Sequence, residues 1–336
     1  MTIYDIAKKA GVSASTVSRV INDKPGVGEA TKERIRRLLE EYNYSPNEAA
    51  RGLVTQSSKI VGILIEDIRI AHHTESAYII EQEMTKRGYT CITLSTGITP
   101  EKKAEYIKIL EQRRVEGAIL IGSMFGTREV EKSIKEHLAD IPIVLVNGSL
   151  DLPNVRGILV DEKQGVEECV DLLIKKGRRN LVFAVDSITP SNNSKMLGFK
   201  NGLKKHGLRE GERFVFYAAD DDTAPEHTIE RGRQATEEII MKCPQVNGII
   251  YSIDLLAVGG LQVCHEKGIA VPGQIAVIGI DNTLYGKICT PKLTTLDNKL
   301  VEVSQNASRI LLEALEGKDT PHGMKIFTDI IQRESS

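Results

Sequence analysis

The first 22 residues place the tightest limits on how this 336-residue chain can fold. They predict two short helices joined at Gly11. Apolar residues recur at helical spacing on both sides of that glycine: Ile3, Ile6, Ala7 and Ala10, then Val17, Val20 and Ile21. Thr2 and Ser13 are each placed to accept a backbone N–H as the N-cap of a helix. A third apolar stripe within residues 29–42 gives both helices a partner, so the pattern is typical of a helix-turn-helix.

The second helix carries a polar stripe roughly opposite its apolar face. Ser15, Ser18, Arg19 and Asn22 recur at the i, i+3, i+4 and i+7 positions. Arg can bind guanine bidentately, Asn suits adenine, and Ser suits either a base edge or a phosphate. A solvated polar face would explain this stripe equally well if the helix stood alone. The capped helix and the glycine turn that precede it favour DNA reading.

Charge is distributed unevenly along the chain. Residues 1–60 hold ten Lys and Arg side chains and seven Asp and Glu side chains, a net charge of +3, whereas the whole chain has a net charge of −2. This asymmetry favours contact between the N-terminal end and a polyanion. The difference is modest, and a charge run is usually an ordinary solvated face.

Four segments of the N-terminal region resemble the signature of one family. They are Thr2–Ala7, Ala10–Ser13, Thr16–Asn22 and Tyr44–Asn47 with Ala50–Leu53. Together they are similar to the start of the lactose-repressor (LacI/GalR) family of bacterial transcription factors. The match is nearly continuous over residues 2–53, and a looser match extends to about residue 333.

The resemblance implies which residues contact DNA. Arg19 is the strongest candidate for direct base readout, and residues 46–53 would form a hinge helix whose Leu53 enters the minor groove as an apolar wedge. Without the resemblance, this segment would be interpreted as a plain interdomain linker. The full set of expected DNA contacts is Tyr4, Ser13, Ala14, Ser15, Thr16, Ser18, Arg19, Asn22, Asn47, Ala50 and Leu53.

The remaining residues alternate between strand and helix patterns. One series runs over residues 59–146 and a second over 158–280, with a last helix at 300–315 and a strand near 325–331. This alternation predicts two α/β lobes with parallel sheets. We therefore expect a helix-turn-helix domain at 1–45, a hinge helix and linker at 46–58, and a two-lobed effector and dimerisation domain at 59–336. The resemblance adds a type I periplasmic-binding-protein-like fold, with the chain crossing between the lobes about three times.

No apolar run reaches membrane-spanning length, and the N-terminus lacks a signal-peptide pattern. The five cysteines are scattered without a CxxC pair, which favours reduced thiols over a disulfide framework or a zinc site. The sequence therefore predicts a cytoplasmic protein with no membrane partner, no metal and no cofactor.

Polar side chains follow several predicted strands, where ligands collect in open α/β sheets. Each could instead be a capping or turn residue. Carboxylates, amides and a few cations around one cleft suit a polyhydroxylated ligand. The expected effector-binding residues are Asp67, Arg69, His72, His73, Asn147, Asp161, Ser191, Lys195, Asp221, Asp254 and Asp281, of which Lys195 and Asp281 fall on effector positions of the family.

The chain departs from the family pattern at several of these positions. Lys195 replaces the usual Arg and cannot form a planar bidentate fork, and His72 and His73 replace an aromatic loop. Further departures are Ile253, the run Asp220–Asp222 and the segment Asp297–Lys299. They indicate that the effector is not a familiar purine or simple sugar bound in the familiar way. Two histidines at the cleft mouth would make binding pH-dependent, while a metal held by that pair alone is unfavourable.

The sequence therefore favours a homodimeric repressor that binds a palindromic double-stranded DNA operator and responds to a small, carbohydrate-like effector. The alternative is a catabolite-control type of regulator whose main co-regulator is a phosphorylated carrier protein. An enzyme is disfavoured, because the chain has no GxGxxG, GxxxxGK[ST], GxSxG or HExxH motif.

Overall fold

The computed structural model describes residues 1–44, 57–208, 214–217 and 224–336, and it divides into two compact units, Met1–Lys59 and Ile60–Ser336. The expected hinge helix at 46–53, with Asn47, Ala50 and Leu53, lies outside the described residues, as does the run Asp220–Asp222.

The described part of the N-terminal unit contains three helices: α1 (Ile3–Ala10), α2 (Ala14–Ile21) and α3 (Glu29–Glu41). Thr2 and Asp5 form a capping box at the start of α1, and Gly11 ends that helix in the left-handed region, with φ of 65°. Ser13 caps α2. Buried residues from all three helices share one core, as the apolar stripes predict. The predicted helix-turn-helix is therefore confirmed.

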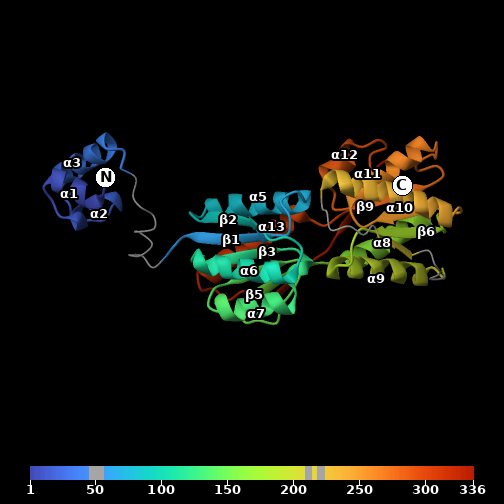
Figure 1. The fold of residues 1–336 in the computed structure, drawn as a ribbon, viewed down its shortest axis with the longest axis horizontal. Coiled ribbons are helices and arrows are strands. Elements are labelled where there is room, and N and C mark those ends of the chain that lie inside the picture. The colour runs from blue at the N-terminus through green and yellow to red at the C-terminus, as the bar shows by residue number, and fades with distance from the viewer. Residues whose placement is uncertain (45–56, 209–213, 218–223) are drawn as a thin grey trace. The chain divides into compact units, whose positions relative to one another are not determined.

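The first lobe of the larger unit is a sheet with helices on both faces (Figure 1). Its strands have the order β11-β5-β4-β3-β1-β2, all parallel: β1 (Ile60–Ile65), β2 (Thr90–Ser95), β3 (Gly117–Ile121), β4 (Ile143–Val146), β5 (Val155–Val160) and β11 (Gly323–Ile326). One face packs on α5 (Ala71–Thr85) and α13 (Leu300–Leu315), the other on α6 (Pro100–Gln112) and α7 (Arg128–His137). A short 3-10 turn, η1 (Ser123–Phe125), follows β3.

The second lobe repeats this architecture. Its strands have the order β12-β10-β9-β8-β6-β7, in which only β12 is antiparallel: β6 (Leu181–Val185), β7 (Phe214–Tyr217), β8 (Gly248–Tyr251), β9 (Ala276–Ile280), β10 (Thr294–Asp297) and β12 (Asp329–Ile331). One face packs on α8 (Glu162–Lys175) and α9 (Pro190–Lys205), the other on α10 (Pro225–Lys242) and α11 (Asp254–Glu266), and the short α12 (Leu284–Ile288) follows β9.

The chain crosses between the lobes three times: after β5, after β10 and between β11 and β12. The resemblance predicted this, and the two-lobed α/β fold is confirmed. One detail of the prediction is wrong, because the single strand expected near 325–331 is two strands, β11 and β12, that belong to different sheets. Strand β10 and helix α12 were not predicted. Across the described residues, no helix is both long and apolar enough to span a membrane.

Candidate functional site

The outer face of α2 in the N-terminal unit is polar and exposed, and Arg19 lies at its centre. Arg19 is exposed, and its guanidinium has no hydrogen bond or ion pair among the described residues. Ser15 is exposed beside it, and Tyr4, on α1, is 74% exposed. An exposed guanidinium between short hydroxyl side chains can meet base edges without disturbing the core.

Other residues expected to contact DNA are partly engaged in holding α2 together. The Ser13 hydroxyl lies 2.7 Å from that of Ser15 and 2.9 Å from that of Thr16. Asn22 is the C-cap residue, and its amide donates to the Ser18 carbonyl at 2.8 Å. The small side chain of Ala14 is half-buried in the same first turn. These positions suit contacts that fix register on phosphates.

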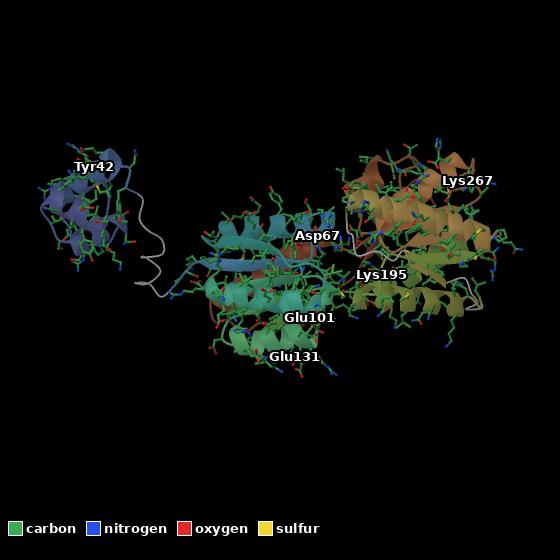
Figure 2. All side chains as sticks on the ribbon, in the orientation of Figure 1. Tyr42, Asp67, Glu101, Glu131, Lys195 and Lys267 are labelled. Carbon is green, nitrogen blue, oxygen red and sulfur yellow. The ribbon has the colours of Figure 1, made fainter. Side chains whose placement is uncertain are left out.

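The larger unit contains a cavity of about 510 Å³ whose lining comes from both lobes and from the crossing segments. This volume falls within the usual range for small-molecule sites. Figure 2 labels Asp67 on the first lobe and Lys195 on the second lobe, both near the place where the two lobes meet. Of the expected effector-binding residues, the described lining includes Arg69, His72, His73, Asn147, Ser191, Lys195, Asp254 and Asp281.

Two expected effector-binding residues lie outside this lining. Asp67 accepts hydrogen bonds from the backbone N–H and the guanidinium of Arg69, with the shortest distance at 2.7 Å. Asp161 caps α8 through the Gln164 N–H and pairs with Lys325 at 3.2 Å. Both residues fill the turn and capping roles that are common for Asp at strand ends. Asp221 lies outside the described residues.

The most connected group in the cavity is the carboxylate of Glu162, at the first crossing. This residue is 2% exposed. Its oxygens accept from the Ser191 hydroxyl at 2.6 Å and lie 3.3 Å from the Lys195 ammonium. They also lie 3.5 Å from the Asn147 amide of the first lobe and 3.4 Å from the Asn298 amide of the second crossing. One buried carboxylate thus contacts both lobes and two crossings.

Lys195 is buried and has its charge matched inside the protein. Burial lowers the pKa of its ammonium, but Glu162, Asp281 and Asp186 outweigh that effect and raise it overall. The ammonium also donates to the Ser252 carbonyl at 3.1 Å. Lys195 therefore remains charged.

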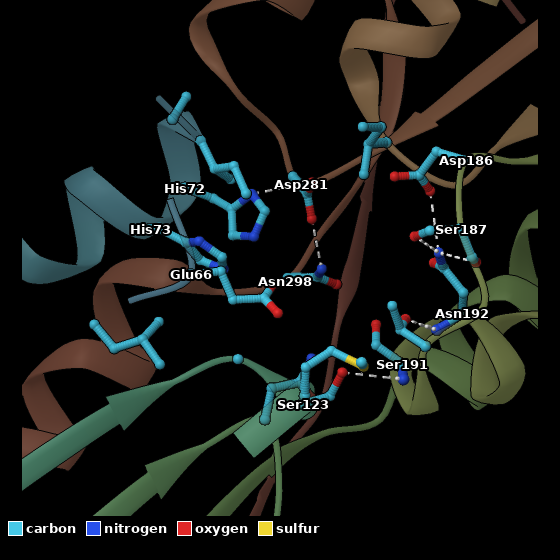
Figure 3. Close-up of a pocket in the computed structure, with 18 of the residues that line it drawn as sticks. Glu66, His72, His73, Ser123, Asp186, Ser187, Ser191, Asn192, Asp281 and Asn298 are labelled. Carbon is cyan, nitrogen blue, oxygen red and sulfur yellow. Dashed lines mark hydrogen bonds and ion pairs between the residues drawn. The ribbon is translucent and has the colours of Figure 1, made fainter. Parts of the chain in front are cut away.

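Two carboxylates of the second lobe face the cavity from the ends of β6 and β9 (Figure 3). Asp186 accepts from the Ser252 hydroxyl at 2.7 Å and the Asn192 amide at 3.0 Å. Asp281 accepts from the Asn298 amide at 2.9 Å, and its other oxygen lies 3.8 Å from His72 Nδ1. The His72–Asp281 contact joins the first lobe to the second. A second bond between the lobes runs from the Ser191 N–H to the Ser123 hydroxyl at 3.4 Å.

Asp254 lies deeper and is bonded on both carboxylate oxygens. One oxygen accepts from the Thr295 hydroxyl at 2.6 Å, and the other from the N–H and hydroxyl of Thr283 at 2.7 and 2.9 Å. Burial, together with the charge of Asp281, raises the pKa of Asp254 to about 7. Asp254 thus fixes the segment after β9, which presents Asp281 to the cavity.

The two histidines, both expected at the mouth of the cleft, line the cavity but occupy different environments. His73 is 4% exposed. Burial, followed by the charges of His72 and Lys103, holds its pKa well below the ordinary value. Its Nδ1 atom has no hydrogen-bond partner among the described residues. His72 is the more exposed ring and the one that faces Asp281.

Several residues with the same chemistry were missed by sequence reasoning. Glu66 directly follows β1 and binds the fully buried Lys103 at 2.8 Å, while Glu162 directly follows Asp161. Asp186 directly follows β6, so the strand-end rule applied elsewhere could have found it. The missed cavity residues are Glu66, Glu162, Asp186, Asn192, Arg231 and Asn298. The described residues contain no group of three or more His, Cys, Asp or Glu side chains arranged for a metal ion.

Known proteins are similar to both units. Residues 2–47 match the model of bacterial regulatory proteins of the lacI family, and residues 170–336 match the periplasmic binding protein-like domain. An HTH-type transcriptional regulator of Lachnoclostridium phytofermentans is 31% identical over 338 residues, covering 100% of this chain and 99% of that protein. Catabolite control protein A of Priestia megaterium is 27% identical, covering 93% and 91%. The Lac repressor bound to ONPG in the repressed state has a TM-score of 0.89 at 20% identity, covering 100% of this chain and 99% of that one.

A helix-turn-helix unit joined to a two-lobed unit with a ligand-sized cavity defines a DNA-binding transcriptional regulator. The chain belongs to the LacI family of bacterial regulatory proteins.

Proposed function

We propose that this chain represses transcription by binding a palindromic operator as a homodimer in the cytoplasm. A small hydroxyl-rich effector, a carbohydrate or a derivative of one, would bind in the cavity between the lobes and change the affinity for DNA. The observation that carries the proposal is the cavity itself. Its lining combines carboxylates, amides and hydroxyls from both lobes, and this mixture suits a ligand whose hydroxyls both donate and accept.

The coupling between effector and DNA follows from where the cavity contacts lie. The pairs His72–Asp281 and Ser123–Ser191 join the lobes beside the cavity. A ligand that contacts both lobes favours one arrangement of them over the other. By linkage, a change in DNA affinity caused by the ligand must be matched by an equal change in ligand affinity caused by DNA.

Exposed apolar side chains support association of the two-lobed units. Tyr78 on α5 and Leu284 and Ile288 on α12 are all more than half exposed. Leu284 and Ile288 are four residues apart on α12 and so share one face of that helix, and apolar faces of this kind often mark a protein interface. A dimer would place two recognition helices on successive half-sites of a palindrome.

The test is a selection of DNA from a random library by the full chain, followed by anisotropy titrations with and without sugars. We expect a palindromic consensus, and an effector that changes DNA affinity by about 5–150-fold. Asp281→Asn should abolish that response and keep DNA binding. Binding without sequence preference would overturn the proposal. A response to a phosphorylated carrier protein alone would favour the catabolite-control alternative.

A further inference from the structure

The cavity wall carries more negative than positive side chains. Within the described lining there are five carboxylates and three permanent cations: Glu66, Glu162, Asp186, Asp254 and Asp281 against Arg69, Lys195 and Arg231. His73 does not redress this balance, because its burial keeps the ring neutral at pH 7. Asp254, whose pKa of about 7 leaves it only partly ionised at pH 7, adds less than a full charge. The other four carboxylates still outnumber the three cations, so a ligand that enters the cavity meets an excess of negative charge.

The cations of the wall already have partners. Arg69 is held by both carboxylate oxygens of Asp67. Lys195 lies against Glu162 and the Ser252 carbonyl. Arg231 donates to the Thr228 hydroxyl at 3.0 Å. An anionic ligand would have to compete with Asp67 for Arg69, or with Glu162 for Lys195.

Three residues of the cavity lining, Asp186 and Asp281 in the second lobe and Asn298 at the second crossing, carry acceptors with unused hydrogen-bonding capacity. Both hydrogen bonds that Asp186 accepts among the described residues end on Oδ1, so its Oδ2 is open. Asp281 accepts from the Asn298 amide on Oδ1, and among the described residues its one ion-pair partner is His72, whose Nδ1 lies 3.8 Å from Oδ2. The Oδ1 atom of Asn298 is buried and has no partner among the described residues. Neither Asp186 nor Asp281 has a Lys or Arg within ion-pair distance in the described part of the chain.

We propose that the effector is a hydroxylated compound with a protonated amine, of the amino-sugar class, whose ammonium is recognised by Asp186 and Asp281. This inference rests on the proposed function of the cavity as an effector site. An ammonium offers three donors and no acceptor, which matches the open acceptors of this wall. It also supplies the opposite charge that partly buried carboxylates need, whereas a carboxylate or phosphate would add to the excess. The hydroxyls would face the amides and hydroxyls that complete the lining.

The test uses the intact chain and sets of hexoses that differ only in charge. Glucosamine, galactosamine and mannosamine are each compared by calorimetric titration with the parent hexose, the N-acetyl derivative and the uronic acid. We expect one amine to bind at least about tenfold more tightly than its parent. Its N-acetyl derivative should lose that advantage, since acetylation keeps the nitrogen but removes the charge.

Variants locate the preference in the wall. Asp186→Asn and Asp281→Asn keep the side-chain shape and should bring the amine-to-parent affinity ratio close to one, while the exposed Asp140→Asn should leave the ratio unchanged. Because the ratio is measured within one protein, a general loss of affinity cannot imitate this result. Thermal unfolding of each variant shows that it is folded.

The possible results distinguish a failure of the amino-sugar inference from a failure of the proposed effector site. Tighter binding of a parent hexose or a uronic acid than of its amine would overturn the inference and leave the effector site standing. An amine preference that survives both cavity variants would overturn the role of Asp186 and Asp281. If no compound binds, both the amino-sugar inference and the carbohydrate effector fail, whereas operator selection still tests DNA binding independently.

Discussion

The polar face of α2 and the cavity of the larger unit place their polar residues in opposite settings. Arg19 and Ser15 are exposed and contribute little to the stability of the fold around them. Glu162 and Lys195 are buried and bonded to residues from distant parts of the chain. Substitutions on α2 should therefore change binding without changing stability, whereas substitutions in the cavity should change both.

The strongest test of this difference is Glu162→Ala. The substitution leaves the buried Lys195 ammonium without its carboxylate and removes the acceptor of the Ser191 hydroxyl. Removing one partner of a buried ion pair costs about 3–5 kcal/mol. We expect that loss in the free energy of unfolding of the two-lobed unit, measured by urea titration.

Glu105→Ala is the matched control, since Glu105 is exposed on a helix of the same unit. Surface substitutions of this kind usually stay within about 0.5 kcal/mol. Equal losses for Glu162→Ala and Glu105→Ala would show that the buried network carries no stability, and the contrast with α2 would disappear.

Arg19→Ala tests the other half of the comparison, the exposed polar face of α2. Removing the guanidinium should weaken operator binding by about 1–3 kcal/mol and relax specificity at one base pair of each half-site. The free energy of unfolding should not change, because the side chain has no partner among the described residues. Anisotropy titrations on the selected operator and its single-base variants measure the first effect.

Lys24→Ala is a useful control, because Lys24 is an exposed cation of the same unit that lies beyond the end of α2. It should weaken binding to all sequences alike, if it changes binding at all. A uniform loss for Arg19→Ala as well would contradict base readout and assign Arg19 to the phosphates.

The same contrast governs how much could be predicted from sequence. Local patterns were sufficient for the helix-turn-helix, because caps, turn and apolar stripes all lie within 42 residues. The lobes also followed from alternation, yet β10 was missed because Thr294 and Thr295 do not look like a buried strand. The strand expected near 325–331 was divided between two sheets by a crossing that periodicity does not reveal.

The cavity was harder to predict for a physical reason. Residues that follow strands can be identified one by one, and most of those identified do line the cavity. Their bonding partners cannot be identified this way, because Asn147, Ser191 and Asn298 reach Glu162 from separate segments. Whether an Asp caps a helix, as Asp161 does, or faces a ligand cavity is decided only by the fold.

The last comparison concerns Asp254, a buried carboxylate whose charge is unfavourable to the folded state. Its pKa is raised to about 7 from the ordinary value of 3.8 for an Asp side chain. Between those two values the folded chain therefore holds a proton that the unfolded chain has released. Stability from this group is therefore present at low pH and is lost as pH rises towards 7. The slope is at most about 1.4 kcal/mol per pH unit.

In Asp254→Asn this contribution to the slope of stability against pH should vanish, whatever constant cost the amide adds. Urea titrations of both proteins from pH 4.5 to 7, in steps of about half a unit, measure the two slopes. Parallel profiles would mean that the bonds from Thr283 and Thr295 keep Asp254 ionised throughout, and that this part of the cavity wall carries its negative charge at no cost to stability.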